Sequence, residues 1–375
     1  MSSVEVAGVV GGRIGDWIIE DLLAFGEPQR FACRRSSGDE EPAVVLVAPL
    51  GGSGERKLER EYQALRVLDH LGVPRVMDWG RDDDRGLAYL ATDYFDGDPL
   101  ADWLITGPLD WRDACHVMRH IAEALLEVHR HSLVHRDVNP TKVLVGPGWS
   151  ARLVGFDLCL DAAQSNTNVE VPTGQITYIA PEVIAQDDYG PRADLYALGV
   201  VFFEAITGRP AFPAALRSDR PDAAKRMLQW KTRAAPLDPG DVAPGWMARL
   251  IQKATHPTPA ERLPDIEAFI GWLDAAEAAW RRRPQRVQPV AVAATAPPPP
   301  ILAVGSSFAP PAHTVPPVPQ PSFALPPREQ PTVEFTEVVV AGLPVALGYL
   351  FAVALGVFSA VAFSALVILM VEVLL

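Results

Sequence analysis

The sequence predicts an α+β fold with two unequal lobes, a small strand-rich lobe followed by a larger helical one. Between residues 16 and 97, short runs alternate between apolar and polar residues or are continuously apolar, which is typical of strands. After Pro99 the apolar residues recur mainly at helical spacing. Composition then changes sharply beyond residue 283. We therefore divide the chain into an N-terminal extension (1–14), a folded domain (15–283), a proline-rich linker (284–337) and a C-terminal membrane segment (338–375).

The elements of the folded domain follow from these patterns in order. Alternation predicts two short strands around a turn within 16–35, and the run "AVVLVAPL" at 43–50 predicts a buried strand. Two further strands are predicted in 75–80 and 86–97. Helical periodicity predicts helices at 55–71 and 112–132.

Charge and cysteine content exclude some classes of function. The formal net charge is −13, and an acidic chain repels the phosphate backbone of DNA and RNA. Cys33, Cys115 and Cys159 are odd in number and widely spaced, which favours reduced thiols in a cytosolic domain. The N-terminus has no basic start and is a poor signal peptide. We expect no nucleic-acid partner and a domain that stays in the cytoplasm.

The linker is rich in proline, which lacks an N–H group and fixes φ. This composition cannot build a helix or a central strand, so it predicts a semi-rigid polyproline II spacer. Its PxxP units leave binding to SH3-like partners as an alternative to a plain linker.

The C-terminal segment carries no charged residue from Val338 to Val371. At ~1.5 Å per residue this exceeds the ~30 Å hydrocarbon core, so one tilted span at about 350–370 is predicted. Two spans would lack a polar turn. The arginines lie before the span and only Glu372 follows it, which places the N-terminal side in the cytoplasm. The prediction is a single-pass protein of the cell inner membrane.

Small residues recur every fourth position within the C-terminal segment. On a helix they share one face, where a second helix can approach closely. We predict a possible homodimer through Gly348, Ala352, Gly356, Ala360 and Ser364.

Several motifs occur in a fixed order in the folded domain. They are "HRD" at 135–137, "APE" at 180–182, "DLYALGVVFFEAITGRPAF" at 194–212 and "HPTPAERL" at 256–263. In this order and spacing, the chain resembles a bacterial Ser/Thr protein kinase from about residue 15 to 275. The resemblance implies a bilobal protein-kinase-like domain.

The resemblance assigns roles to residues that are retained. Asp137 matches the catalytic base, and Glu61 matches the helix glutamate that normally pairs with a strand lysine. The other retained residues have architectural roles, and they are His135, Phe156, Glu182, Asp194 and Arg262.

Other family positions have lost their usual residues. We place Val47 at the position of the strand lysine, and the glycine-rich loop keeps only Gly26. The two metal-ligand positions hold Gly155 and Lys142, so Mg²⁺ is disfavoured in its usual place. Asp157, two residues beyond Gly155, is an alternative ligand.

The nucleotide slot is altered as well. We expect Val45 and Phe31, both larger than the family's residues, to fill part of it. ATP remains a possible ligand, with candidate contacts at Gly26, Val45, Lys142 and Leu144. An alternative role for Lys142 is that its charge replaces Mg²⁺ and binds nucleotide phosphate without metal.

Three classes of function stay open. The first is a membrane-anchored pseudokinase, a binding or allosteric module with a protein or kinase partner. The second is an active, non-standard ATP-dependent Ser/Thr kinase that uses Asp137 as its base. The third is an interaction protein in which the linker carries the function. Phosphorylation by a partner kinase at Ser165, Thr167, Thr173 or Thr177, with Arg136 receiving the charge, is a further hypothesis.

Overall fold

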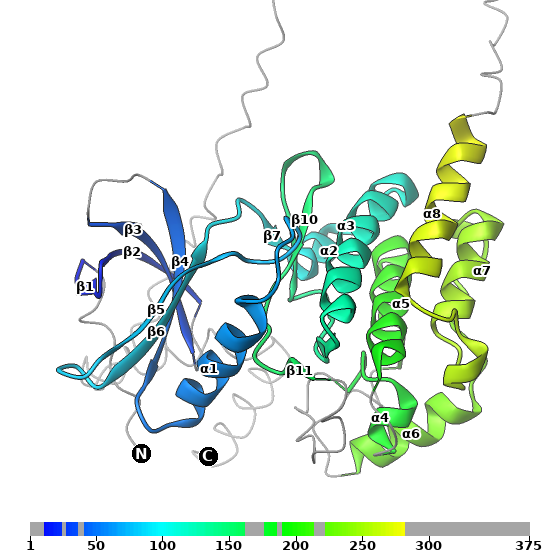
Figure 1. Cartoon of the computed structure of the whole chain (residues 1–375). Helices are drawn as coiled ribbons and strands as arrows, with labels where there is room; N and C mark the ends of the chain where they lie inside the picture. Colours follow the sequence, from blue (N-terminus) through cyan, green and yellow to red (C-terminus); the bar gives the residue numbers. More distant parts are fainter. Residues whose placement is uncertain are drawn as a thin grey trace, which may run out of the picture. The chain divides into compact units, whose positions relative to one another are not determined.

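The computed structural model describes residues 11–24, 28–36, 41–161, 176–185, 190–213 and 222–281. The chain divides into two compact units, Met1–Ala291 and Val292–Leu375. All described residues belong to the first unit, which has the predicted order of a small sheet lobe and a larger helical lobe (Figure 1). Gly26, the linker, the predicted span and its small residues lie outside the described part. None of the helices described there is both long and apolar enough to span a membrane.

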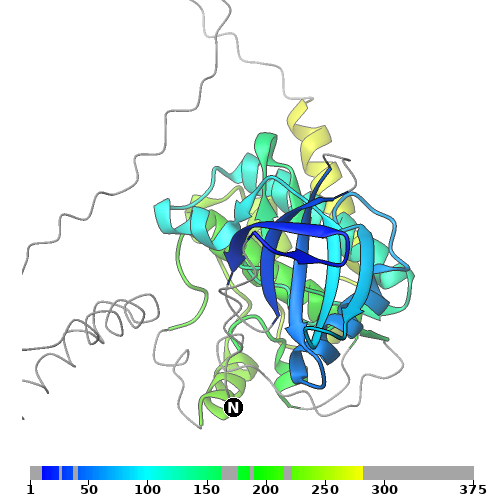
Figure 2. The same cartoon turned by 90° about the vertical axis from the view of Figure 1, so that its left-hand side faces the viewer.

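A six-stranded antiparallel sheet forms the small lobe and faces the viewer in Figure 2. Its order is β1-β2-β3-β4-β6-β5. The predicted strands are confirmed, although the sheet already begins at Arg13, inside the predicted extension. The strands are β1 (Arg13–Ile14), β2 (Trp17–Ala24), β3 (Gln29–Arg35), β4 (Pro42–Pro49), β5 (Val76–Asp82) and β6 (Leu87–Asp93).

One helix, α1 (Ser53–Leu65), covers a face of this sheet (Figure 1). It ends six residues before the predicted end at residue 71. Beyond Leu65, Leu68 is still buried in the core, whereas Val67 and Leu71 are exposed. Pro74 then disfavours the helical conformation at the residue before it.

The large lobe is mainly helical. Its central helix, α5, is buried along nearly its whole length, and α3 packs against it with one apolar face. The helices are α2 (Leu100–Thr106), α3 (Trp111–Arg130), α4 (Pro181–Ile184), α5 (Pro191–Thr207), α6 (Ala223–Arg233), α7 (Gly245–Ala254) and α8 (Ile266–Arg281). Short strands lie between them: β7 (Asp98–Pro99), β8 (Leu133–Val134), β9 (Val143–Val145), β10 (Ala151–Leu153) and β11 (Leu160–Asp161).

A buried carboxylate on α5 holds the loop that follows β8. Asp194 accepts the backbone N–H groups of His135 and Arg136, each at 2.9 Å, and lies 2.9 Å from Nε2 of His129 on α3. Burial alone would raise the pKa of Asp194, but these hydrogen bonds hold it below its usual value. The carboxylate therefore stays ionised and fixes two helices and one loop together.

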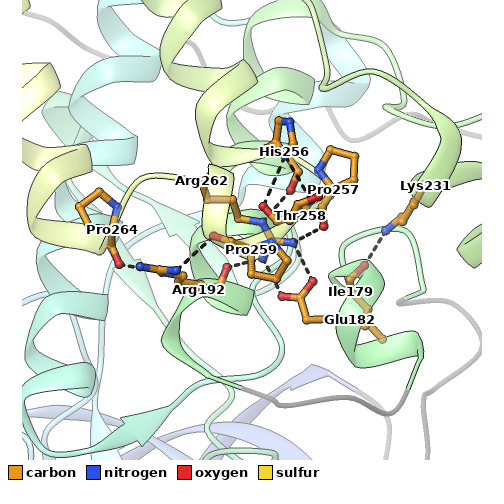
Figure 3. Close-up of polar contacts among 10 residues, drawn as sticks. All are labelled: Ile179, Glu182, Arg192, Lys231, His256, Pro257, Thr258, Pro259, Arg262 and Pro264. Atoms are coloured by element: carbon orange, nitrogen blue, oxygen red, sulfur yellow. Dashed lines mark hydrogen bonds and ion pairs between the residues drawn. The ribbon is translucent and has the colours of Figure 1, made fainter.

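A buried arginine joins the segment around α4 to the chain before α8. Nη1 and Nη2 of Arg262 donate to the two carboxylate oxygens of Glu182 at 2.6 and 2.7 Å (Figure 3). The same guanidinium donates to the carbonyls of Arg192, His256 and Pro257. A fully satisfied bidentate pair of this kind fixes geometry as well as charge.

Sequence reasoning missed a buried lysine, Lys231 of α6, which is 2% exposed. Burial lowers the pKa of Lys231 well below its usual value. Its Nζ donates to the carbonyls of Ile176 and Thr177 at 3.2 and 2.7 Å, and to that of Ile179 at 2.6 Å. Figure 3 shows the contact with Ile179. The ammonium also lies 5.0 Å from the ring centre of Tyr196 and 4.6 Å from that of Phe212. Lys231 thus replaces water as the donor to three buried carbonyls just before α4.

Replacement of Lys231 by methionine is expected to lower the free energy of unfolding by about 2–4 kcal/mol, because three buried acceptors lose their donor. Lys225→Met is the matched control, since Lys225 is exposed on the same helix. Its effect should stay within about 0.5 kcal/mol. Urea unfolding of both variants measures the difference, and equal effects would contradict a structural role for Lys231.

Candidate functional site

The register of β3 and β4 decides which side chains face α1. Leu46 packs in the same core cluster as Leu58 and Leu65 of α1, whereas Val45 and Val47 belong to a separate cluster. Val47 was therefore the wrong position for the missing lysine by one residue, and Leu46 occupies the face toward α1. A one-residue slip moves every side chain to the other face of a sheet. The corrected position also lacks a lysine, because it holds Leu46.

The corrected register also contradicts the prediction that Val45 and Phe31 fill part of the nucleotide slot. Val45 and Phe31 lie opposite each other and are buried in the separate cluster with Trp17, away from α1. Val45 is therefore not a slot residue. On the face toward α1, β3 and β4 present Ala32 and Val44, which pair across the strands and are half-buried. Leu144 of β9, also half-buried, remains a candidate from the large lobe.

Glu61 is turned inward from α1 and is 4% exposed. Its Oε1 accepts the backbone N–H of Phe156 at 3.2 Å. Burial raises the pKa of Glu61, and the positive charge of Arg30 on β3 is the largest opposing influence. Glu61 thus connects the helix of the small lobe with the segment that carries Gly155.

The rings of His135 and Phe156 stack edge to face with centroids 4.7 Å apart. Both side chains are fully buried, and Phe156 lies in the cluster that contains Leu65 of α1. Burial lowers the pKa of His135 to about 4, so the ring is neutral at physiological pH. The stack connects the two lobes through apolar contact.

Lys142 lies between two carboxylates. Its Nζ is 3.6 Å from Oδ2 of Asp137 and 3.7 Å from Oδ1 of Asp157, and its side chain is 15% exposed. The other oxygen of Asp137 accepts from Nδ2 of Asn139 at 2.8 Å. Burial raises the pKa of Asp137 to about 6, and the charge of Lys142 opposes that rise. Both oxygens of the predicted base therefore have protein partners.

Gly155 provides the space that Lys142 occupies. A Cβ at position 155 would come within 2.5 Å of Nζ and 2.7 Å of Cδ of Lys142. Gly155 also has φ of +82°, a conformation that side chains other than Asn and Asp rarely adopt. Gly155 and Lys142 are therefore physically coupled, although in the sequence they are two separate differences from the family pattern.

These residues do not fit a magnesium ion. Mg²⁺ needs a near-octahedral set of oxygen donors, and here an ammonium group is held between the two carboxylates. Asp157, considered as an alternative ligand, pairs with Lys142 instead. Among the residues that the structure describes, no group of three His, Cys, Asp or Glu side chains is placed to hold a metal.

Comparison with known proteins identifies this architecture. Residues 43–270 match the family model of the protein kinase domain, so the chain belongs to the protein kinase family. It is 28% identical over 268 residues to serine/threonine-protein kinase PrkC of Bacillus subtilis, which covers 69% of this chain and 38% of that protein. It is 34% identical over 162 residues to serine/threonine-protein kinase PknA of Mycobacterium tuberculosis, covering 42% of this chain and 37% of that protein.

A third relative is serine/threonine-protein kinase pkn2 of Myxococcus xanthus, 29% identical over 235 residues, or 58% of this chain and 27% of that protein. The matches thus cover less than two thirds of the length of each relative. Homology to the bacterial Ser/Thr kinases is distant, and it places the chain in their family without deciding its catalytic status.

Gly155→Ala is expected to lower the free energy of unfolding by about 2–3 kcal/mol, because the backbone has positive φ and the new methyl group displaces the end of Lys142 from between its two carboxylates. In a Lys142→Ala background the same change should cost only about 1 kcal/mol from backbone strain, because the contested space is then empty.

Gly148→Ala is the matched control, because Gly148 has φ of +66° and nothing within 4 Å of its Cβ position. It should cost only about 1 kcal/mol from backbone strain. Denaturant unfolding of Gly155→Ala, Lys142→Ala, the double variant and Gly148→Ala measures the coupling. Additive effects at 142 and 155 would show that the two residues do not compete for space.

Proposed function

We propose that this member of the Ser/Thr protein kinase family acts as a membrane-anchored binding or allosteric module, with catalysis impaired. One observation carries the proposal: the ammonium of Lys142 lies between Asp137 and Asp157, in the space left by Gly155. A tethered cation at this point takes the place that a dissociable metal ion would need.

The chemistry of phosphoryl transfer explains why this impairs catalysis. Kinases depend on positioning and on metal ions that bridge and neutralise the phosphates. A lysine contributes one positive charge and no open coordination positions, whereas Mg²⁺ contributes two charges and orients the phosphates through its ligands. Asp137 is further restrained by Asn139, which donates to the oxygen that Lys142 does not contact.

The preserved architecture supports a role in binding. Asp194 holds the loop of the predicted base, Arg262 holds Glu182, and Glu61 holds the backbone of Phe156. These contacts join elements of both lobes into one framework. Such a framework is suited to present a fixed surface to a protein partner.

An active, non-standard kinase is the second candidate. Asp137 and Glu61 favour it, and the raised pKa of Asp137, about 6, is close to the working pH of a general base. In this alternative, Asp137 accepts the proton of the substrate hydroxyl after Lys142 or Asn139 releases one carboxylate oxygen.

The test is a phosphoryl-transfer assay with the purified full-length chain, radiolabelled ATP, Mg²⁺ and a general protein substrate. We expect no transfer above that of Asp137→Asn, because the metal-dependent stabilisation of the phosphates is absent. Mg²⁺-dependent transfer by the wild-type chain that Asp137→Asn abolishes would reject the proposal and favour the active kinase.

Membrane anchoring rests on the uncharged stretch from residue 338 to 371. We propose a single pass at about 350–370, with the kinase-like domain in the cytoplasm and the proline-rich linker as a spacer. The small-residue face would pair two copies. Cell fractionation should find the full chain in the membrane fraction and a chain that ends at residue 337 in the soluble fraction. Equal distribution of the two would contradict the anchor.

A further inference from the structure

An apolar groove lies on the helical lobe between α3, α7 and α8. Both α3 and α7 pack against α8 (Figure 1). The larger part of the groove has a volume of about 390 Å³ and includes Trp272 of α8, and a smaller part of about 210 Å³ lies against α3. Both parts share Trp111, Trp246 and Ala276, so they form one continuous surface. We call this surface the tryptophan groove, after Trp111, Trp246 and Trp272.

The three tryptophans of the groove are half-buried. The rings of Trp111 and Trp246 meet edge to face with centroids 6.4 Å apart, and the guanidinium of Arg112 lies 4.3 Å from the centre of the Trp111 ring. These contacts hold two of the rings in place. Tryptophan is enriched at binding surfaces, because it supplies a large apolar area and loses little conformational entropy when it is fixed. The groove therefore has the features of a binding site.

The lining of the larger part favours a ligand with few backbone donors. Among the described residues, those that line it are tryptophan, proline, glycine or alanine, and none of them is charged. A buried N–H group without an acceptor is costly, and proline has no N–H group. A polyproline II segment also loses little entropy on binding because its conformation is preformed, and such segments dock in aromatic-lined grooves. The chemistry of the groove therefore fits a proline-rich peptide.

The chain itself carries such a peptide in the linker that follows α8. This helix lines the groove as far as Ala279, and the described part of the chain ends at Arg281. The linker begins at residue 284, and its longest proline run is Pro297–Pro300. Pro297 follows Arg281 by 16 residues, which can span up to about 50 Å at ~3.1 Å per residue. A tether this short gives an effective concentration in the millimolar range, so even a weak site would be largely occupied.

We propose that the tryptophan groove binds the proline-rich segment 296–301 of the chain's own linker in the polyproline II conformation. The proline rings lie against Trp111, Trp246 and Trp272, and the segment extends over both parts of the groove. Docking removes residues 284–301 from the spacer, so it sets how far the kinase-like domain reaches from its proposed membrane anchor. This inference goes beyond the proposed function, and it does not depend on whether the domain transfers phosphate.

The chemical labelling of Cys115 reports whether the groove is occupied. Cys115 lines the smaller part and is half-buried, whereas Cys33 and Cys159 are buried and serve as internal references. Burial raises the pKa of Cys115 to about 12, so its reaction with N-ethylmaleimide is slow and all chains are compared at one pH. The comparison is with a full-length linker variant in which serine replaces each residue of Pro297–Pro300. We expect labelling of the wild-type chain to be about fivefold slower or more, measured by site-resolved mass spectrometry.

A synthetic peptide of residues 293–304 provides a second measurement. Calorimetry should detect its binding to the linker variant, and the bound peptide should restore the protection of Cys115. The same peptide with alanine in place of its four prolines should not bind. The wild-type chain should bind the peptide about tenfold more weakly than the linker variant or less, because its own segment competes.

Gly271→Leu, added to the linker variant, tests the site itself. Gly271 lines the groove and has nothing within 4 Å of its Cβ position, so the leucine side chain enters the groove without a clash. Leucine also favours a helix more than glycine does. The change should weaken peptide binding about tenfold or more. Glu267→Leu is the matched control, because Glu267 is exposed in the first turn of the same helix, and it should leave peptide binding unchanged. Melting temperatures show whether both variants are folded.

Equal labelling of Cys115 in the wild-type chain and the linker variant, or full peptide binding by a folded Gly271→Leu chain, would overturn the proposal. Protection of Cys115 in the linker variant that rises with protein concentration would assign the groove to a second copy of the chain. Protection that appears only in lipid bilayers would assign it to lipid. Both of these outcomes would also overturn the docking of the linker.

Discussion

The buried carboxylate of Asp194 is the constraint on which the rest of the site depends. It receives two consecutive backbone N–H groups from the loop after β8 and a histidine from α3. Without these bonds the loop would leave buried donors unsatisfied, which costs more than the bonds themselves contribute. The positions of His135, Asp137 and Asn139 all follow from that loop. The stack with Phe156 and the contact of Phe156 with Glu61 then extend the order to α1.

The loop also positions the residues around Lys142, and their contacts occupy the carboxylate of Asp137. The loop brings Asp137 to the position expected of a general base, but Asn139 and Lys142 engage its two oxygens. Electrostatic preorganisation is usually the largest contribution to catalysis. Here the ordered groups stabilise one another, because Lys142 lies between Asp137 and Asp157. The residue that holds the loop, Asp194, differs from the residues that contact Asp137, which are Lys142 and Asn139. The loop can therefore keep its position while the contacts of Asp137 differ.

Much of this was predictable from the sequence. Alternating and continuous apolar runs located β2 to β6, and the spaced motifs located Asp137, Glu182, Asp194 and Arg262. The strand register was not predictable, because "AVVLVAPL" is apolar on both faces and gives no alternation to set the phase. That one-residue error also misplaced Val45 and Phe31. Lys231 was missed because a single lysine on an amphipathic helix carries no signal of burial. The contact of Lys142 with the space at Gly155 joins residues whose proximity only the folded chain reveals.

The fit of Lys142 against Gly155 has an evolutionary consequence. A chain that regained an acidic residue at 155 while it kept the lysine would suffer a clash, and a chain that lost the lysine first would leave two buried carboxylates facing each other without a cation. Each single step back toward metal-dependent chemistry therefore passes through a less stable protein. We therefore expect substitutions at 142 and 155 to be tolerated better together than singly.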